Sequence, residues 1–176
     1  MKKFLVNKNN TFKKGFTIVE VIIACAIITI TVLSLMSAAS KGIELSGRAL
    51  RQSQANTLLE EGAEAVKTIR DQNWSTISAL SLNTPYYLFY NINTNVWSLS
   101  NSLSTPTSSI PTYPIDDIFS RQVVFEEVYR DGNDDIQEGG TYLDDSTKKV
   151  TISVSFVHSE DEISKDLVFY LADIFN

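Results

Sequence analysis

The apolar residues of this chain change their spacing twice along the sequence. Residues 16–39 form an almost unbroken apolar run whose only charge is Glu20. Apolar residues then recur every three or four positions, separated by charged and amide residues, which is typical of an amphipathic helix. Because the helical pattern does not stop between the two stretches, we expect one helix from about Thr17 to about Gln72, roughly 80 Å long. The expected stripe consists of Ile43, Leu45, Ala49, Leu59, Ala63, Val66 and Ile69.

Three glycines interrupt this helical pattern. Gly42, Gly47 and Gly62 each weaken a helix by about 1 kcal/mol relative to alanine. They are candidate kink points. A local melt near Gly42 and Gly47 and an undisturbed helix both agree with the sequence.

Beyond Trp74 the apolar positions alternate, which indicates strands. A turn is expected at 91–95 and a surface loop in the Ser-, Thr- and Pro-rich segment 100–114. The expected strands cover residues 86–90, 96–99, 118–130, 149–158 and 165–172.

One of these strands shows which face of the sheet is buried. Val150, Ile152, Val154 and Phe156 alternate with Thr151, Ser153 and Ser155, as in a sheet with one covered face. The natural cover is the outer half of the helical stripe. The sequence therefore predicts an α+β fold in which a long N-terminal helix packs on an antiparallel sheet.

The apolar run is long enough to cross a membrane. Its 24 residues span roughly 36 Å as a helix, against about 30 Å for a hydrocarbon core. A secretory signal would have a shorter apolar region followed by its cleavage site. The lysines that precede the run favour a cytoplasmic N-terminus, with the rest of the chain on the outer side. Lys2, Lys3, Lys8, Lys13 and Lys14 make up this basic leader.

Charge and composition exclude several functions. The chain of 176 residues carries a formal charge of −6, and removing the five leader lysines leaves ten lysine and arginine residues against 21 acids, a charge of −11. Such a domain lacks the basic face that binds nucleic acid. With Cys25 and His158 as the only cysteine and histidine, and no phosphate-binding or nucleophile motif, we expect no enzyme and no cofactor.

The junction between leader and helix carries a specific signal. The segment Lys13-Lys14-Gly15-Phe16-Thr17-Ile18-Val19-Glu20 resembles the prepilin processing site of type IV pilins and type II secretion pseudopilins. The resemblance implies cleavage after Gly15 by a prepilin peptidase and methylation of the new terminus at Phe16. It also implies assembly of the helix into a filament with other pilin subunits, driven by a pilus assembly platform.

Glu20 is the residue of this helix that is least favourable to insert into a membrane, because a carboxylate within the hydrocarbon core raises the free energy unless an opposite charge pairs with it. The resemblance implies that Glu20 pairs with the terminal amine of Phe16 on a neighbouring subunit, which would set the register of assembly. A carboxylate that reaches back to the membrane surface is the alternative.

A second segment, further along the predicted helix, narrows the choice of subtype within this family. The segment from Glu61 to Trp74 is similar to PilV-type minor pilins and I-type pseudopilins. The implied organisation is a leader at 1–15, a transmembrane and filament-core helix at 16–40, an amphipathic continuation at 41–73 and a sheet domain at 74–176. A minor pilin or pseudopilin is the leading hypothesis. A membrane-tethered extracytoplasmic binding module, not assembled into a filament, is the alternative.

Two features of the expected sheet domain allow binding hypotheses. Asp131, Asn133 and Asp135 place oxygen atoms at alternate positions, as calcium loops do, but Ile136 and Tyr142 depart from the EF-hand pattern. We favour an acidic hairpin turn there. We also favour a sheet-capping role over a ligand face for the aromatic residues Tyr86, Tyr87, Tyr90, Trp97 and Tyr113.

Overall fold

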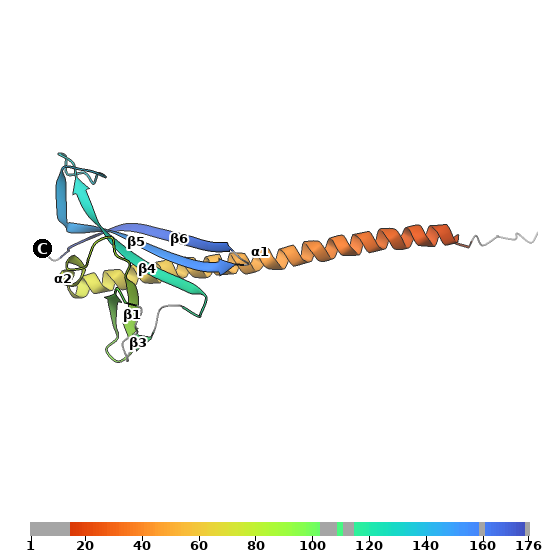
Figure 1. Cartoon of the computed structure of the whole chain (residues 1–176), viewed down its shortest axis with the longest axis horizontal. Coiled ribbons are helices and arrows are strands. Elements are labelled where there is room, and N and C mark those ends of the chain that lie inside the picture. The colour runs from red at the N-terminus through yellow and green to blue at the C-terminus, as the bar shows by residue number, and fades with distance from the viewer. Residues whose placement is uncertain (1–14, 103–108, 111–114, 159–160, 175–176) are drawn as a thin grey trace, which may run out of the picture. The chain divides into compact units, whose positions relative to one another are not determined.

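The computed structural model describes residues 15–102, 109–110, 115–158 and 161–174. The chain divides into two compact units between Gly47 and Arg48. Helix α1 (Ile18–Gln72) continues through this boundary, and none of the three glycines interrupts it (Figure 1). The predicted helix is therefore confirmed to within one residue at its start, and of the two alternatives left open at Gly42 and Gly47 the structure has the helix without a local melt. The leader before Gly15 and Tyr113 lie outside the described residues.

The second unit contains a three-stranded antiparallel sheet in the order β4-β5-β6. Its strands are β4 (Phe119–Arg130), β5 (Tyr142–His158) and β6 (Asp161–Ala172). The alternating pattern predicted all three, but β5 begins at Tyr142 instead of Lys149 and β6 at Asp161 instead of Lys165. The extra residues are mostly polar, so their sequence does not alternate in hydrophobicity although their backbones pair.

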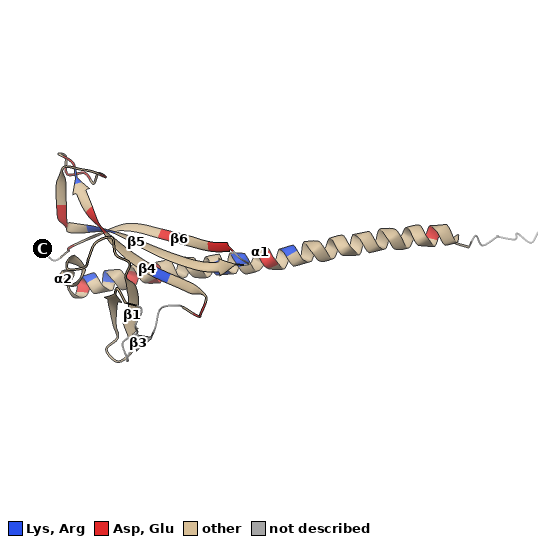
Figure 2. Cartoon of the chain, in the orientation of Figure 1, with Lys and Arg blue, Asp and Glu red and all other residues tan. Residues whose placement is uncertain are grey.

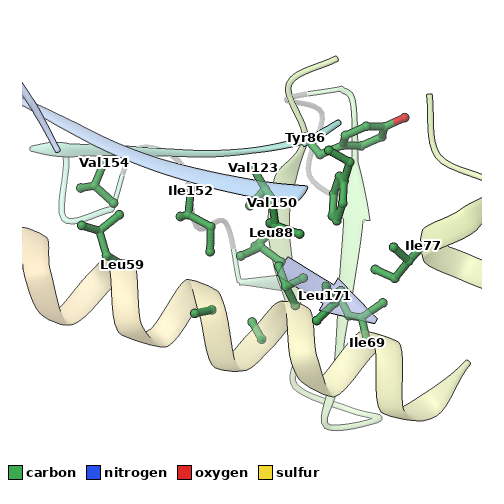
Figure 3. Close-up of a cluster of buried hydrophobic side chains, with 14 of the residues drawn as sticks. Leu59, Ile69, Ile77, Tyr86, Leu88, Val123, Val150, Ile152, Val154 and Leu171 are labelled. Carbon is green, nitrogen blue, oxygen red and sulfur yellow. The ribbon is translucent and has the colours of Figure 1, made fainter. Parts of the chain in front are cut away.

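The core of this unit lies between the sheet and the C-terminal half of α1. Val150, Ile152, Val154 and Phe156 of β5 are all at most 2% exposed, which confirms the predicted inner face. Figure 3 shows Val154 pointing at Leu59 and Ile152 pointing toward the helix further along. The same cluster contains Ala55, Leu59, Ala63, Val66 and Ile69 of α1.

The N-terminal part of the predicted stripe has no cover. Ile43 and Leu45 are 76% and 55% exposed, and Ala49 is also exposed. Only the outer half of the stripe was predicted to pack on the sheet, and its four predicted contact residues are confirmed in the core: Leu59, Ala63, Val66 and Ile69. Only the part from Ala55 to Ile69 packs on the sheet.

A smaller sheet in the order β2-β1-β3 completes the second unit. Strands β1 (Tyr87–Asn91) and β2 (Val96–Ser100) form the predicted hairpin, and Asn95 at its turn has a positive φ of 54°. Strand β3 (Ser109–Ile110) lies within the segment expected to be a loop. The short helix α2 (Trp74–Ser78) was also not predicted; Asn73 caps it by accepting a hydrogen bond from the Ser75 amide.

Candidate functional site

The junction between Gly15 and Phe16 lies outside the helix. Residues 15–17 have no regular structure, and Phe16 is 81% exposed. Helix α1 begins two residues later, with its first backbone hydrogen bond from the amide of Val21 to the carbonyl of Thr17 at 3.2 Å. A protease needs a peptide bond in accessible, non-helical backbone, and this geometry provides one at the predicted cleavage position.

Thr17 caps the start of the helix. Its hydroxyl oxygen accepts a hydrogen bond from the backbone amide of Glu20 at 3.3 Å. This contact satisfies one of the amides that a helix start otherwise leaves unpaired. The threonine of the processing site therefore also fixes where α1 begins, a role that the Thr-x-x-Glu spacing signals and that the sequence-based predictions missed.

Glu20 is the only acidic residue in the first turn of α1. Its side chain is exposed, and none of the cations within the described residues forms an ion pair with it. The unpaired amides at the helix start favour a negative charge in this position, but they supply no full counter-charge. The carboxylate is therefore accessible to a cationic group outside the described chain.

The apolar segment of α1 has no protein cover in the isolated chain. It is the only helix in the described part of the chain that is long and apolar enough to cross a membrane, and none of its apolar window is buried. Figure 2 shows this stretch as uncharged beyond Glu20. Large side chains such as Ile18, Leu33 and Leu35 are 61–81% exposed, so the segment requires lipid or other apolar helices around it.

Three of the hydroxyl groups within this segment are bonded inside the helix. Thr29, Thr31 and Ser34 donate to the carbonyl oxygens of Cys25, Ile28 and Ile30, each at 2.8 Å. These bonds remove unsatisfied donors from an apolar surface. Glu20 is the only charged side chain of residues 16–39, and it has no such partner within the described chain.

The acidic loop after β4 uses its leading carboxylate internally. Oδ1 of Asp131 accepts hydrogen bonds from the amides of Asn133 at 2.8 Å and Asp135 at 3.0 Å. No three His, Cys, Asp or Glu side chains in the described residues are arranged to hold a metal ion. The two hydrogen bonds are those of a capped turn, and the expectation that this loop binds no calcium stays a prediction.

Asp144 fixes the neighbouring part of β5. Its carboxylate accepts hydrogen bonds from Arg130 Nε at 2.7 Å and from Ser146 Oγ at 2.6 Å. Partial burial alone would raise the pKa of Asp144, but the hydrogen bonds from Ser146, Arg130 and Thr147 lower it well below its usual range. At this point the pairing partner of β4 moves from Lys148 to Asp144, which leaves Asp145–Thr147 as a bulge.

An open pocket of about 610 Å³ lies beside the bulge. Its one basic group, Arg130, is already held by Asp144 and by the carbonyl of Asp134. The pKa of Arg130 is raised, chiefly by its hydrogen bond to Asp144. Arg130 and Asp144 therefore hold the loop together and are not available to a ligand of the pocket. The pocket is lined by Arg130, Asp131, Gly132, Asp134, Tyr142, Leu143, Asp144 and Ser146.

The aromatic residues of the domain support the sheets. Tyr86 is buried, lies edge-on to Phe125 with 6.1 Å between ring centroids, and accepts a hydrogen bond from the Ser81 amide. Tyr90 and Trp97 contact each other across the β1-β2 hairpin at 5.1 Å. These contacts agree with a capping role for Tyr86, Tyr90 and Trp97; for Tyr87 and Tyr113 the role stays a prediction.

Comparison with known proteins gives one match. Residues 11–36 match the family model described as the prokaryotic N-terminal methylation motif, the prepilin-type signal of type IV pilins and pseudopilins. No curated protein and no solved structure matches the chain. The matched segment contains Gly15, Phe16, Thr17 and Glu20, and with the long apolar helix and antiparallel sheets it supports a pilin-like substrate of a prepilin peptidase.

Proposed function

We propose that this chain is a minor pilin or pseudopilin, cut by a prepilin peptidase after Gly15 and assembled through α1 into a type IV pilus or a related filament. One observation carries the proposal. The predicted cleavage junction after Gly15 lies in exposed, non-helical backbone within the segment that matches the methylation motif, directly before an apolar helix whose one carboxylate has no ion pair among the described residues. The sheet domain acts as a packing and surface module and not as an enzyme.

The mechanism follows from the chemistry of the new terminus. Cleavage would leave Phe16 with a positively charged amine at the membrane surface. Glu20 lies four residues further along the chain, and its carboxylate forms no ion pair with any cation of the described residues. An ion pair between Glu20 and the amine of a neighbouring subunit would compensate both charges in an apolar setting and set the axial register of the two helices. The partners are other pilin subunits, the peptidase and the assembly platform.

The charge of the leader supports one orientation of the chain across the membrane. The leader has five lysines and no acid, so we propose that it stays cytoplasmic and that the sheet domain is extracytoplasmic, reaching the cell surface after assembly. The acidic remainder of the chain gives no reason to expect direct nucleic-acid binding.

The proposal is tested by the intact mass of the full chain expressed with and without a prepilin peptidase. We expect loss of residues 1–15 together with the gain of one methyl group, and no cleavage of Gly15→Ala. The next measurement is recovery in sheared filaments: wild type should be present, whereas Glu20→Ala should be processed and folded but absent. An uncut chain beside a processed control prepilin would favour the membrane-tethered module instead.

A further inference from the structure

Two cations lie on the sheet face that packs against α1. Arg121 of β4, Val154 of β5 and Lys165 of β6 form one cross-strand row. Val154 is fully buried, and Figure 3 shows it opposite Leu59. The two cations flank this apolar contact on either side.

Both cations bind oxygen atoms of the same helical turn. Nη1 of Arg121 donates to the backbone carbonyl of Leu58 at 3.0 Å. Nζ of Lys165 donates to Oδ1 of Asn56 at 2.9 Å. These are directional contacts between the sheet and one short stretch of α1. The core further along, around Val66 and Ile69, is apolar.

Arg121 is poorly explained as a source of stability. It is only 1% exposed, its Nε has no hydrogen-bond partner, and its ion pair with Glu61 is long, at 3.5 Å, to a carboxylate that is 46% exposed. The ring of Trp97 lies 5.8 Å from the guanidinium carbon, an attraction that does not satisfy the unpaired Nε donor. A buried charge with such incomplete pairing commonly contributes less to stability than an apolar residue of similar size.

The apolar surfaces alone do not distinguish neighbouring registers well. The helix side is built largely from small residues, and β5 repeats valine and isoleucine at every second position. Apolar burial is non-directional, so a shift of α1 by one turn, about 5.4 Å, would still cover much of the same area. A directional polar contact favours one of these registers over the others, as single buried polar residues do in coiled coils.

Gly62 completes the geometry. A Cβ atom at this position would lie 3.2 Å from Cδ of Arg121 and 3.3 Å from Cγ2 of Ile152. The missing side chain therefore forms a notch that admits the stem of Arg121. Since the neighbouring inner-face residues of α1, such as Leu59, Ala63 and Val66, all carry a side chain, a shifted helix would present a Cβ where the arginine needs space.

We propose that Arg121, seated in the notch at Gly62 and bonded to the Leu58 carbonyl, is a positioning residue that selects one register of α1 on the sheet. Lys165 holds the other side of the same turn. The role is independent of whether the chain enters a filament. It makes the domain adopt a single arrangement on the helix at the expense of some stability.

The test uses the full chain in detergent micelles in a Cys25→Ser background, with spin labels at Thr68→Cys on α1 and Glu162→Cys on β6. Pulsed electron paramagnetic resonance then reports the distance distribution between helix and sheet. We expect one narrow distance for the Arg121 protein. Arg121→Met should keep or raise the thermal midpoint and give a broadened distribution with a second component displaced by about one helical turn, 5.4 Å.

Lys149→Met is the matched control, because Lys149 is a cation on the opposite face of β5, paired with Glu126. It should retain the single narrow distance. An unchanged distribution in Arg121→Met would overturn the proposal, as would equal broadening in the control. Failure of Arg121→Met to fold would also overturn it, because it would make Arg121 a stabilising residue and not a selector of register.

Discussion

The backbone amide of Glu20 donates a hydrogen bond to the hydroxyl of Thr17, 3.3 Å away. Two residues of the methylation motif therefore close the first turn of α1 together. This contact fixes the helix start at Ile18 and leaves Gly15 and Phe16 in accessible backbone. The motif therefore contains both the predicted cleavage junction and the capping residue that starts the helix after it.

Thr17→Val should loosen the helix start without changing side-chain volume greatly. Removal of a capping hydroxyl costs about 1 kcal/mol, and the loss should be confined to the first turn. We expect faster amide hydrogen exchange at Glu20 and Val21 in micelles and unchanged exchange beyond residue 30. Thr17→Ser retains the hydroxyl and should exchange like wild type. Equal protection in both variants would show that Thr17 does not cap α1.

Gly62→Ala should destabilise the domain although alanine is the better helix former. The gain in helix propensity is about 1 kcal/mol, but overpacking a filled core costs about 1–3 kcal/mol. Both nearby side chains are constrained, since Ile152 is fully buried and Arg121 is bonded to Leu58. We expect a net loss of about 1 kcal/mol in denaturant unfolding.

Gly47→Ala is the matched control for this substitution. A Cβ atom at Gly47 meets no atom within 4 Å, and the residue lies in the same helix. It should leave the unfolding midpoint unchanged or raise it slightly. A stabilised Gly62→Ala protein would mean that Arg121 and Ile152 can move aside. The space at Gly62 would then not be required for the position of Arg121.

The sequence predicted those parts of the fold that depend on regular apolar spacing. The limits of α1, the buried face of β5 and the Asn91–Asn95 turn all follow from local patterns. The start of β5 at Tyr142 does not, because its order depends on hydrogen bonds that join Asp144 to Arg130 across the hairpin. Helix α2 is too short to produce a periodic signal.

Local sequence patterns predicted only some of the residues of interest in this chain. Gly15, Phe16 and Glu20 stand in a recognisable local order, and their roles in processing and assembly remain predictions. Arg121 was missed, although it alternates in sequence with Phe119, Val123 and Phe125 on the inner face of β4. An arginine at such a position is a usable signal. Its partner Leu58, however, is 63 residues away and contributes a backbone oxygen that no pattern of side chains reveals.

Asp144→Asn should lower stability at neutral pH and flatten its acid dependence. The pKa of Asp144 is lowered in the folded state, so its stabilising effect is fully present above the unfolded value of about 3.9 and is lost as the pH falls below it. Asparagine keeps an acceptor but loses the charge that Arg130 binds. We expect a loss of about 1–2 kcal/mol at pH 7 in urea unfolding.

The difference between wild type and Asp144→Asn should shrink between about pH 5 and pH 2, because over this range the carboxylate becomes protonated in the unfolded chain while it stays charged in the folded chain. Asp145→Asn changes the same charge on the exposed neighbouring residue and should have little effect. A constant difference across this pH range would mean that the carboxylate charge does not stabilise the β5 bulge.

Asp131 provides a test that separates a turn from a calcium site. If its Oδ1 atom serves as the acceptor for the amides of Asn133 and Asp135, Asp131→Asn should keep both bonds, because the amide oxygen occupies the same position. Asp131→Ala should lose them and expose the loop to proteolysis several-fold faster. Added calcium should not shift the thermal midpoint of any of the three proteins relative to a chelator control. A calcium-dependent rise in wild type that Asp131→Asn abolishes would instead establish a metal site in this loop.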